Sequence, residues 1–155
     1  MEFGDLGAGD QNSTDDFRAL SARHLAKQMY ERALQGCETA LGLDHTSTLD
    51  TVNNLGNLYQ KQGKLVEAEQ MYERALRGYE KALGAENITT YIPALNTIWS
   101  FGSLFGEGTD LAKTRIMYSK ALAGYEKAVG PNHPKSHSLR ESLRALDTST
   151  GKKTA

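Results

Sequence analysis

A 14-residue segment occurs three times in this chain with little change, and this repetition constrains the fold more than any other feature. The copies begin at Met29, Met71 and Met117 and read MYERALQGCETALG, MYERALRGYEKALG and MYSKALAGYEKAVG. The first two copies agree at 11 of 14 positions, and the last two agree at 10 of 14. An active site needs different groups that converge on one place, whereas a chain that repeats one surface is suited to stacking.

The spacing of the copies defines the repeating unit. Met29 and Met71 are 42 residues apart, and Met71 and Met117 are 46 apart, so the second unit carries four extra residues. The extra residues fall in the linker between Gly84 and Leu95, because the sequences on either side of it align without a gap. A period of 20 to 50 residues is typical of solenoid proteins built from stacked helix pairs.

Each unit contains two kinds of amphipathic segment. Small and apolar residues recur at i, i+3, i+4 and i+7, the spacing of one helical face. In the first kind these residues are Val52, Leu55, Gly56 and Tyr59, matched by Ile98, Phe101, Gly102 and Phe105. In the second kind they include Ala68, Tyr72, Ala75 and Leu76, with equivalents in the other two copies. Glycine inside a helix costs about 1 kcal/mol relative to alanine, so the recurring Gly56 and Gly102 indicate close helix packing.

The expected order is a helix over 15–41, helical hairpins over 47–83 and 91–129, and a helix over 134–147. Helix ends are expected at Gly63, Gly42, Gly84 and Gly130, where glycine favours a left-handed backbone. Hydroxyls of Thr46–Thr48 and Thr89–Thr90 are expected to cap helix starts. We therefore predict an all-α domain over 15–147, between a disordered acidic N-terminus (1–14) and a disordered basic tail (148–155).

Composition excludes several classes of function. Eighteen Lys and Arg against 19 Asp and Glu give a net charge of −1, which argues against a nucleic-acid-binding protein. No apolar run approaches the roughly 18 residues of a membrane span, and no secretory signal pattern opens the chain. The lone Cys37 cannot form an internal disulfide, and the sequons at Asn12 and Asn87 are read as accidental. These features predict a cytoplasmic protein.

No constellation of residues indicates catalysis, and no cofactor is expected. His133 and His137 lie four residues apart but lack further metal ligands nearby, and His45 occupies the same linker position as His133. Cys37 aligns with a tyrosine in both other copies, which indicates a packed side chain rather than a nucleophile. The segment STGKKT lacks the first glycine and the final hydroxyl residue of a phosphate-binding loop.

The hairpin expected over 47–83 carries four signals in order: Gly-x-x-Tyr, then a glycine, then an alanine, then Tyr-x-x-Ala-Leu. This order resembles the tetratricopeptide repeat, and the resemblance covers about residues 20–147. The 42-residue period, with GLDHTSTLDTVNNLGNLYQKQGKLVEAEQMYERAL, is similar to the long repeats of kinesin light chains and to the repeat tails of fungal NACHT or NB-ARC receptor-like proteins. The resemblance implies a superhelix of antiparallel helix pairs that binds a protein or peptide. Thr109 and Thr114 replace Gly63 and Ala68 in the last unit, and a looser hairpin is expected there.

The same resemblance implies that the first helix of each pair lines a concave groove. The groove positions are Asp50, Asn53, Asn57 and Gln60, then Asn96, Trp99 and Ser103, then Glu141, with Asn54 beside them. Asparagine amides offer both a donor and an acceptor to an extended peptide, and Trp99 offers a large apolar contact. The alternative for each is a solvated or packed side chain with no ligand. Asp50 and Glu141 favour a neutral or basic peptide.

A second function stays open at this point. Solenoid ends need a polar outer face for solubility, and here a lone helix stands at each end of the two hairpins. Leu139, Leu143 and Leu146 recur at helical spacing in the last of these helices. The chain is therefore also read as a self-assembly module that associates through its end helices, as a homo-oligomer.

Overall fold

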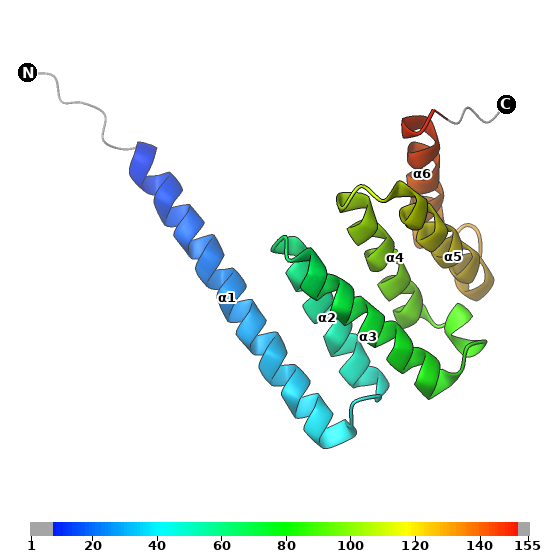
Figure 1. The fold of residues 1–155 in the computed structure, drawn as a ribbon, viewed down its shortest axis with the longest axis horizontal. Coiled ribbons are helices and arrows are strands. Elements are labelled where there is room, and N and C mark those ends of the chain that lie inside the picture. The colour runs from blue at the N-terminus through cyan, green and yellow to red at the C-terminus, as the bar shows by residue number, and fades with distance from the viewer. Residues whose placement is uncertain (1–7, 152–155) are drawn as a thin grey trace, which may run out of the picture.

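A computed structural model describes residues 8–151, and in this part of the chain the protein is all-helical, which confirms the predicted fold class (Figure 1). The elements are α1 (Ala8–Leu41), α2 (Thr46–Lys61), α3 (Leu65–Leu83), a short 3-10 helix (Asn87–Thr89), α4 (Ile92–Glu107), α5 (Leu111–Val129) and α6 (Pro134–Ser149). The predicted disorder of residues 1–7 and 152–155 lies outside the described residues.

Two antiparallel hairpins, α2–α3 and α4–α5, form the middle of the molecule, with α1 before them and α6 after them (Figure 1). Helix α1 begins at Ala8 and so includes residues that we expected to precede the domain at 15. Its first turns are rich in acidic residues, and Asp15 lies 3.8 Å from Arg18.

Three clusters of buried side chains form a continuous core. The first joins α2 to α3 through Leu49, Val52, Ala75 and Tyr79. The second joins α4, α5 and α6 through Leu95, Ile98, Ala121, Tyr125 and Leu139. The third holds the two hairpins together through Ala68, Tyr72, Phe101 and Leu104. The repeated tyrosines of the 14-residue segment therefore serve the core, as three rings that are 0 % exposed, Tyr72, Tyr79 and Tyr125.

The glycines within the helices permit close helix contact, as the sequence predicted. A β-carbon at Gly56 would lie 2.8 Å from the ring of Tyr72 and 3.1 Å from Cβ of Met71. The equivalent Gly102 faces Tyr118 at 2.8 Å and Met117 at 2.9 Å. The absence of a side chain at these positions lets the paired helices approach.

The helix ends partly follow the expectation. Gly42, Gly63, Gly84 and Gly130 all have positive φ angles, between 74° and 96°, as predicted. The predicted threonine caps are wrong. His45 is the N-cap of α2, and its Nδ1 accepts a hydrogen bond from the backbone N–H of Ser47 at 3.2 Å. His133 caps α6 in the same way through Lys135 N–H, and Tyr91 precedes α4 without a side-chain cap.

Thr109 adopts the backbone conformation of the glycine that it replaces. Its φ angle is 68°, against 74° for Gly63, and it is the one non-glycine residue with positive φ in the described part of the chain. Thr114 is buried, and its hydroxyl donates to the carbonyl of Asp110 at 3.0 Å. The expected loosening of this hairpin is therefore not visible in its turn, which closes through a strained residue.

The two end helices differ in the faces that they expose. Leu139 of α6 is buried in the second core cluster, so it is not available for association as the self-assembly reading required. Ion pairs with α5 also hold α6, between Arg140 and Glu126 at 2.6 Å and between Arg115 and Asp147. Helix α1 contacts α2 with one side only, and its first half projects away from the bundle (Figure 1).

Candidate protein-binding surface

Five of the nine predicted groove residues line a face formed by α2, α4 and the start of α6, which we call the inner face. Two adjoining hollows of about 340 Å³ each lie on it and share Gln60 and Ser100. The first hollow is lined by Gln60, Asn96, Trp99, Ser100, Ser103 and Lys135. The second is lined by Asn57, Gln60, Lys61, Ser100 and Glu107. The structure therefore brings together Asn57, Gln60, Asn96, Trp99 and Ser103.

Hydroxyl groups from the core hold the polar side chains of α2 in place. The hydroxyl of Tyr72 lies 2.7 Å from the side-chain amides of both Gln60 and Asn57; it donates its one proton to Gln60 Oε1 and can accept from the amide of Asn57. The hydroxyl of Tyr79 donates to the carboxylate of Asp50. Each tyrosine lies on α3, so the second helix of the hairpin fixes the side chains that the first helix presents.

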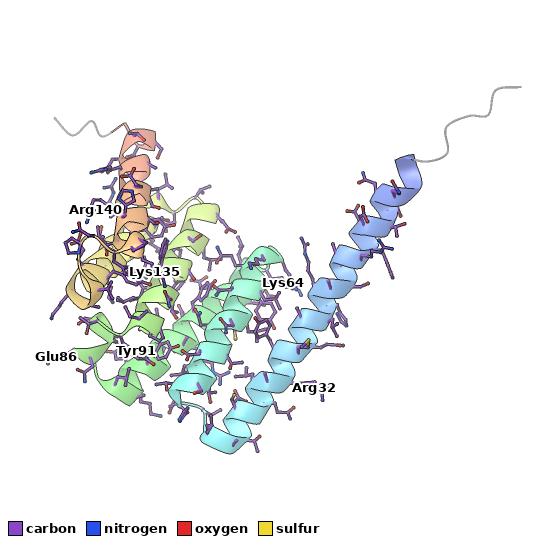
Figure 2. The ribbon with its side chains drawn as sticks, turned by 180° about the vertical axis from the view of Figure 1, so that it is seen from behind. Arg32, Lys64, Glu86, Tyr91, Lys135 and Arg140 are labelled. Carbon is purple, nitrogen blue, oxygen red and sulfur yellow. The ribbon has the colours of Figure 1, made fainter. Side chains whose placement is uncertain are left out.

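Asn96 is fixed in the same way on α4. Its Oδ1 accepts from the hydroxyl of Tyr125 and from the ammonium of Lys135, the latter at 2.5 Å. Lys135 stands among α4, α5 and α6, and its ammonium lies 5.4 Å from the centre of the Tyr125 ring (Figure 2). Trp99 meets the same ring edge-on, with 6.2 Å between ring centres. An ammonium can only donate, so the oxygen of Asn96 must face it and the amide nitrogen must face away.

Gln60 and Asn53 link α2 to α4. Gln60 Nε2 donates to Glu107 Oε1 at 2.6 Å and to Ser103 Oγ at 3.3 Å. A carboxylate only accepts, which places the nitrogen of Gln60 toward α4 and its oxygen toward Tyr72. The hydroxyl of Thr97 lies 3.0 Å from Asn53 Oδ1 and 3.1 Å from the carbonyl oxygen of Pro93, and its one proton is shared between them.

One consequence concerns Asn96 on the inner face. Its amide orientation is fixed because its Oδ1 faces the ammonium of Lys135, which can only donate, as well as the hydroxyl of Tyr125. Within the described residues, its amide nitrogen has no hydrogen-bond partner. Asn96 is half-buried. It therefore offers a donor of fixed orientation, which suits a carbonyl oxygen of a bound backbone.

Burial keeps the tyrosine hydroxyls protonated. It raises the pKa of Tyr125 to about 12. Burial also raises the pKa of Tyr72 and Tyr79, and for Tyr79 the hydrogen bond to Asp50 adds to the effect. The hydroxyl donors that orient Gln60 and Asn96 are therefore present throughout the neutral range.

Some predicted residues stand apart from the hollows, and some of the lining was missed. Asn54 is exposed and lines neither hollow. Glu141 is exposed and paired with Arg144 at 2.6 Å. Ser100 and Glu107 were omitted by the i, i+3, i+7 pattern. Ser100 lies one residue past Trp99 and Glu107 lies four residues past Ser103, so a broader helical face would have included them. Lys61 is the last residue of α2, and Lys135 is the second residue of α6. The spacing of a helical face gives little guidance to side-chain positions at helix ends.

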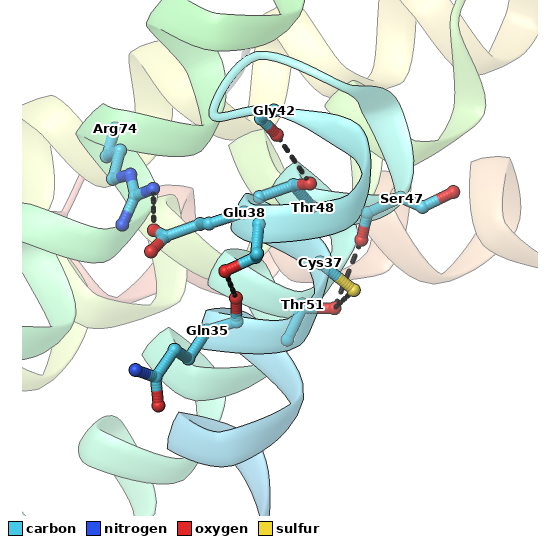
Figure 3. A network of polar contacts seen from close by, with 9 residues as sticks. Gln35, Cys37, Glu38, Gly42, Ser47, Thr48, Thr51 and Arg74 are labelled. Atoms are coloured by element: carbon cyan, nitrogen blue, oxygen red, sulfur yellow. Dashed lines mark hydrogen bonds and ion pairs between the residues drawn. The ribbon is translucent and has the colours of Figure 1, made fainter.

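Cys37 lies in the junction of α1 with the first hairpin, as a packed side chain was expected to. It is half-buried, and its Sγ is 3.9 Å from Thr51 Oγ1 (Figure 3). In the same network Arg74 of α3 donates to Glu38 at 2.5 Å, and Thr48 donates to the carbonyl of Gly42 at 2.8 Å (Figure 3). These contacts attach α1 to the hairpin by its C-terminal half.

Two further features were searched for among residues 8–151. No helix there has the length and apolar character needed to cross a membrane. No group of three or more His, Cys, Asp and Glu side chains there is placed to hold a metal ion.

The fold and the repeated hairpin define a tetratricopeptide-type α-solenoid. Residues 17–81 match the family model described as tetratricopeptide repeat. Repeats of this family generally mediate protein–protein interactions. No curated protein sequence matches the chain.

Two solved structures share the fold. One is BtubC (BKLC) from P. vanneervenii, with a TM-score of 0.73, 20% identity and 85% of this chain covered. The other contains the nearly identical TPR-like repeats of a putative kinesin light chain from Podosopora anserina, with a TM-score of 0.73, 16% identity and 91% of this chain covered. The chain spans 51% and 65% of these two structures respectively. The similarity to kinesin light chain-like repeat proteins is therefore one of architecture.

Proposed function

We propose that the inner face captures an extended segment of a partner protein, and that the chain acts as a non-enzymatic interaction module. The observation that carries this proposal is the amide of Asn96, whose oxygen is held by Tyr125 and Lys135 and whose nitrogen has no partner within the described residues. An extended peptide has unpaired backbone carbonyls that need such a donor. The cost of ordering this side chain is already met in the free protein, which favours affinity.

The two hollows supply the rest of the contact. Trp99 presents a half-buried aromatic surface beside Lys135, and Glu107 and Lys61 line the far hollow. Tryptophan at a partly desolvated position is a common source of binding energy. Because both signs of charge are present, net charge gives the groove little selectivity. Our preference for a neutral or basic peptide rests on Asp50 and Glu141 and stays a prediction.

The experiment separates donation by the amide from its other contacts. Asn96→Asp keeps an oxygen for the hydroxyl of Tyr125 and the ammonium of Lys135 and removes the N–H donors, so the fold is retained while the proposed contact is lost. Asn54→Asp is the matched control, because it makes the same chemical change on the neighbouring helix α2, outside both hollows. Peptides selected by the wild type from a displayed random library would be titrated against each variant by calorimetry.

We expect Asn96→Asp to weaken binding by about ten-fold, the effect of one hydrogen bond of about 1.4 kcal/mol. Asn54→Asp should bind like the wild type. Equal weakening by both variants, or by neither, contradicts donation from the inner face. Selection of acidic peptides alone contradicts the preference for neutral or basic ones.

The wider setting of this activity comes from the sequence resemblance. The likeness to repeat tails of fungal NACHT or NB-ARC receptor-like proteins suggests that the module serves recognition within a larger assembly. That setting and the cytoplasmic location stay predictions.

A further inference from the structure

Helix α1 carries an apolar stripe on the side that faces away from α2, which we call the open stripe. It consists of Leu25, Met29, Ala33, Gly36 and Ala40, spaced three or four residues apart on one side of the helix. Leu25 is 57% exposed and Met29 is 64% exposed. Side chains on the opposite side, among them Leu34 and Cys37, make the contacts with the first hairpin.

The repeats within the chain show what such a stripe normally contacts. Gly36 corresponds to Gly78 and Gly124, and in the hairpins the leucines Leu49 and Leu95 occupy the space where a β-carbon of these glycines would lie. A β-carbon at Gly36 would have no atom of another part of the chain within 4 Å. The leucine that the repeat places there is missing.

Met29 lacks its counterpart in the same way. It corresponds to Met71 and Met117, whose Cβ atoms lie close to Gly56 and Gly102 of the preceding helix, at 3.1 and 2.9 Å from a β-carbon built on each glycine. No helix precedes α1 in residues 8–151. In the open stripe, therefore, Gly36 lacks the leucine that contacts its counterparts, and Met29 lacks the glycine that contacts its counterparts.

Helix α6 is not suited to supply the missing contact from a second molecule. It aligns with α2, since Ser136 donates to the carbonyl of Gly130 as Thr48 does to that of Gly42. In this alignment His137, Arg140 and Arg144 stand where α2 has Leu49, Val52 and Gly56. A polar face of this kind ends a stack, so head-to-tail assembly is disfavoured.

We propose that two copies of this chain pair through their open stripes, antiparallel, about a two-fold axis between residues 32 and 33. Residues 29 and 36 are equidistant from that point, as are 25 and 40. Met29 therefore packs on Gly36 of the partner subunit, and Leu25 packs on Ala40 of the partner subunit. Each contact occurs twice, as in any isologous interface. The methionine–glycine contact is the one already made twice inside each molecule.

The antiparallel direction follows from the distribution of side-chain size. The large residues of the stripe lie in its first half and the small residues in its second half. Parallel pairing would set Gly36 against Gly36 and Met29 against Met29, which leaves a gap at one end and crowding at the other. Antiparallel pairing sets Leu25 and Met29 against the small Ala40 and Gly36 of the partner subunit, and it sets Ala33 against Arg32 of the partner subunit at the axis, so large residues meet small ones.

Charge and size predict a weak dimer. The paired segment of 16 residues is about 24 Å long, a short contact between single helices. Arg32 projects from α1 away from the other helices (Figure 2) and would lie near its symmetry mate at the axis. Because salt screens this repulsion, added salt should tighten the dimer.

Sedimentation equilibrium tests the pairing at about 100 µM chain, where a dimer with a Kd of about 10 µM is mostly formed. Gly36→Leu should weaken dimerisation at least ten-fold, and the free helix should tolerate it because the space above Gly36 is open. Met29→Ala should have a similar effect. Ile116→Ala is the matched control, since Ile116 is also 64% exposed but lies on α5. Circular dichroism verifies that each variant keeps its helicity.

The register has its own test, in a Cys37→Ser background. Chains with Met29→Cys mixed with chains with Gly36→Cys should form a disulfide-linked pair on oxidation, whereas Gly36→Cys chains alone should not. A wild type that stays monomeric at about 100 µM, a dimer unaffected by Gly36→Leu, or linkage between two Gly36→Cys chains would each overturn the proposal. A monomeric wild type would leave the stripe to a helix of another polypeptide.

Discussion

Leu49 of α2 occupies the space that a β-carbon of Gly78 on α3 would fill, and Leu95 stands in the same relation to Gly124 in the second hairpin. The repeated glycine of the 14-residue segment is thus one half of a size-matched pair. Its conformational cost within the helix is offset by the burial of a leucine that is 1% exposed.

Gly78→Ala should destabilise the protein, because the added methyl group meets Leu49 in a filled core. We expect a loss of about 1–3 kcal/mol, the usual range for overpacking. Gly106→Ala is the control, since a β-carbon there has its nearest neighbours at an ordinary 3.5 Å and gains helix propensity. Denaturation by urea measures both. A neutral Gly78→Ala would show that Leu49 can move aside.

Thr109→Gly should stabilise the α4–α5 hairpin by about 0.5–1 kcal/mol. A non-glycine residue in the left-handed region costs about 1–2 kcal/mol, and part of this gain is lost to the greater freedom of glycine in the unfolded chain. The φ angle of 68° at Thr109 carries this prediction. Gly63→Ala, the reverse change in the first hairpin, should destabilise. Thermal unfolding of both variants, with opposite shifts in Tm, is the readout.

Leu139→Ala should cost about 2–5 kcal/mol, the range for truncation of a buried leucine. Leu139 is 0% exposed and belongs to the core shared by α4, α5 and α6. Leu143→Ala removes a half-buried leucine from the same helix and should cost less. Chemical denaturation ranks the two. A loss of self-association without loss of stability in Leu139→Ala would restore the role in assembly that its burial argues against.

Stability should fall between about pH 10 and 12 as buried tyrosines ionise. The folded-state pKa of Tyr125 is raised to about 12 from its ordinary 10.0. The unfolded chain therefore loses this proton first as pH rises, and the stabilisation present below pH 10 disappears as the pH passes through 12. Tyr72 and Tyr79 act in the same direction.

Tyr125→Phe supplies the comparison for this alkaline loss. It removes one ionisation and also the hydrogen bond to Asn96, which should cost about 1 kcal/mol at neutral pH. Its stability should then decline less steeply than that of the wild type above pH 10. Unfolding followed by circular dichroism across this range measures both slopes. Parallel curves for the two proteins would show that other groups govern the alkaline transition.

The sequence by itself determined the helices, their pairing into hairpins and most of the helix ends. These follow from local chemistry, because periodic apolar side chains mark one face of a helix and glycine at positive φ ends it. The repeat made the inference stronger than any single segment allows, since Gly56 and Gly102, or Tyr72 and Tyr118, had to be explained together. The resemblance to tetratricopeptide repeats also predicted Asn57, Asn96 and Trp99 on one face.

Only the tertiary structure decided how those side chains are held and which end of the solenoid is open. Asn96 is oriented by Tyr125 and by Lys135, which lie far from it in sequence, and local periodicity has no information on such contacts. The sequence treated the two end helices alike, but Leu139 is buried and Met29 is exposed. The physical reason is that burial depends on which neighbouring helix is present, and that is a property of the assembled stack.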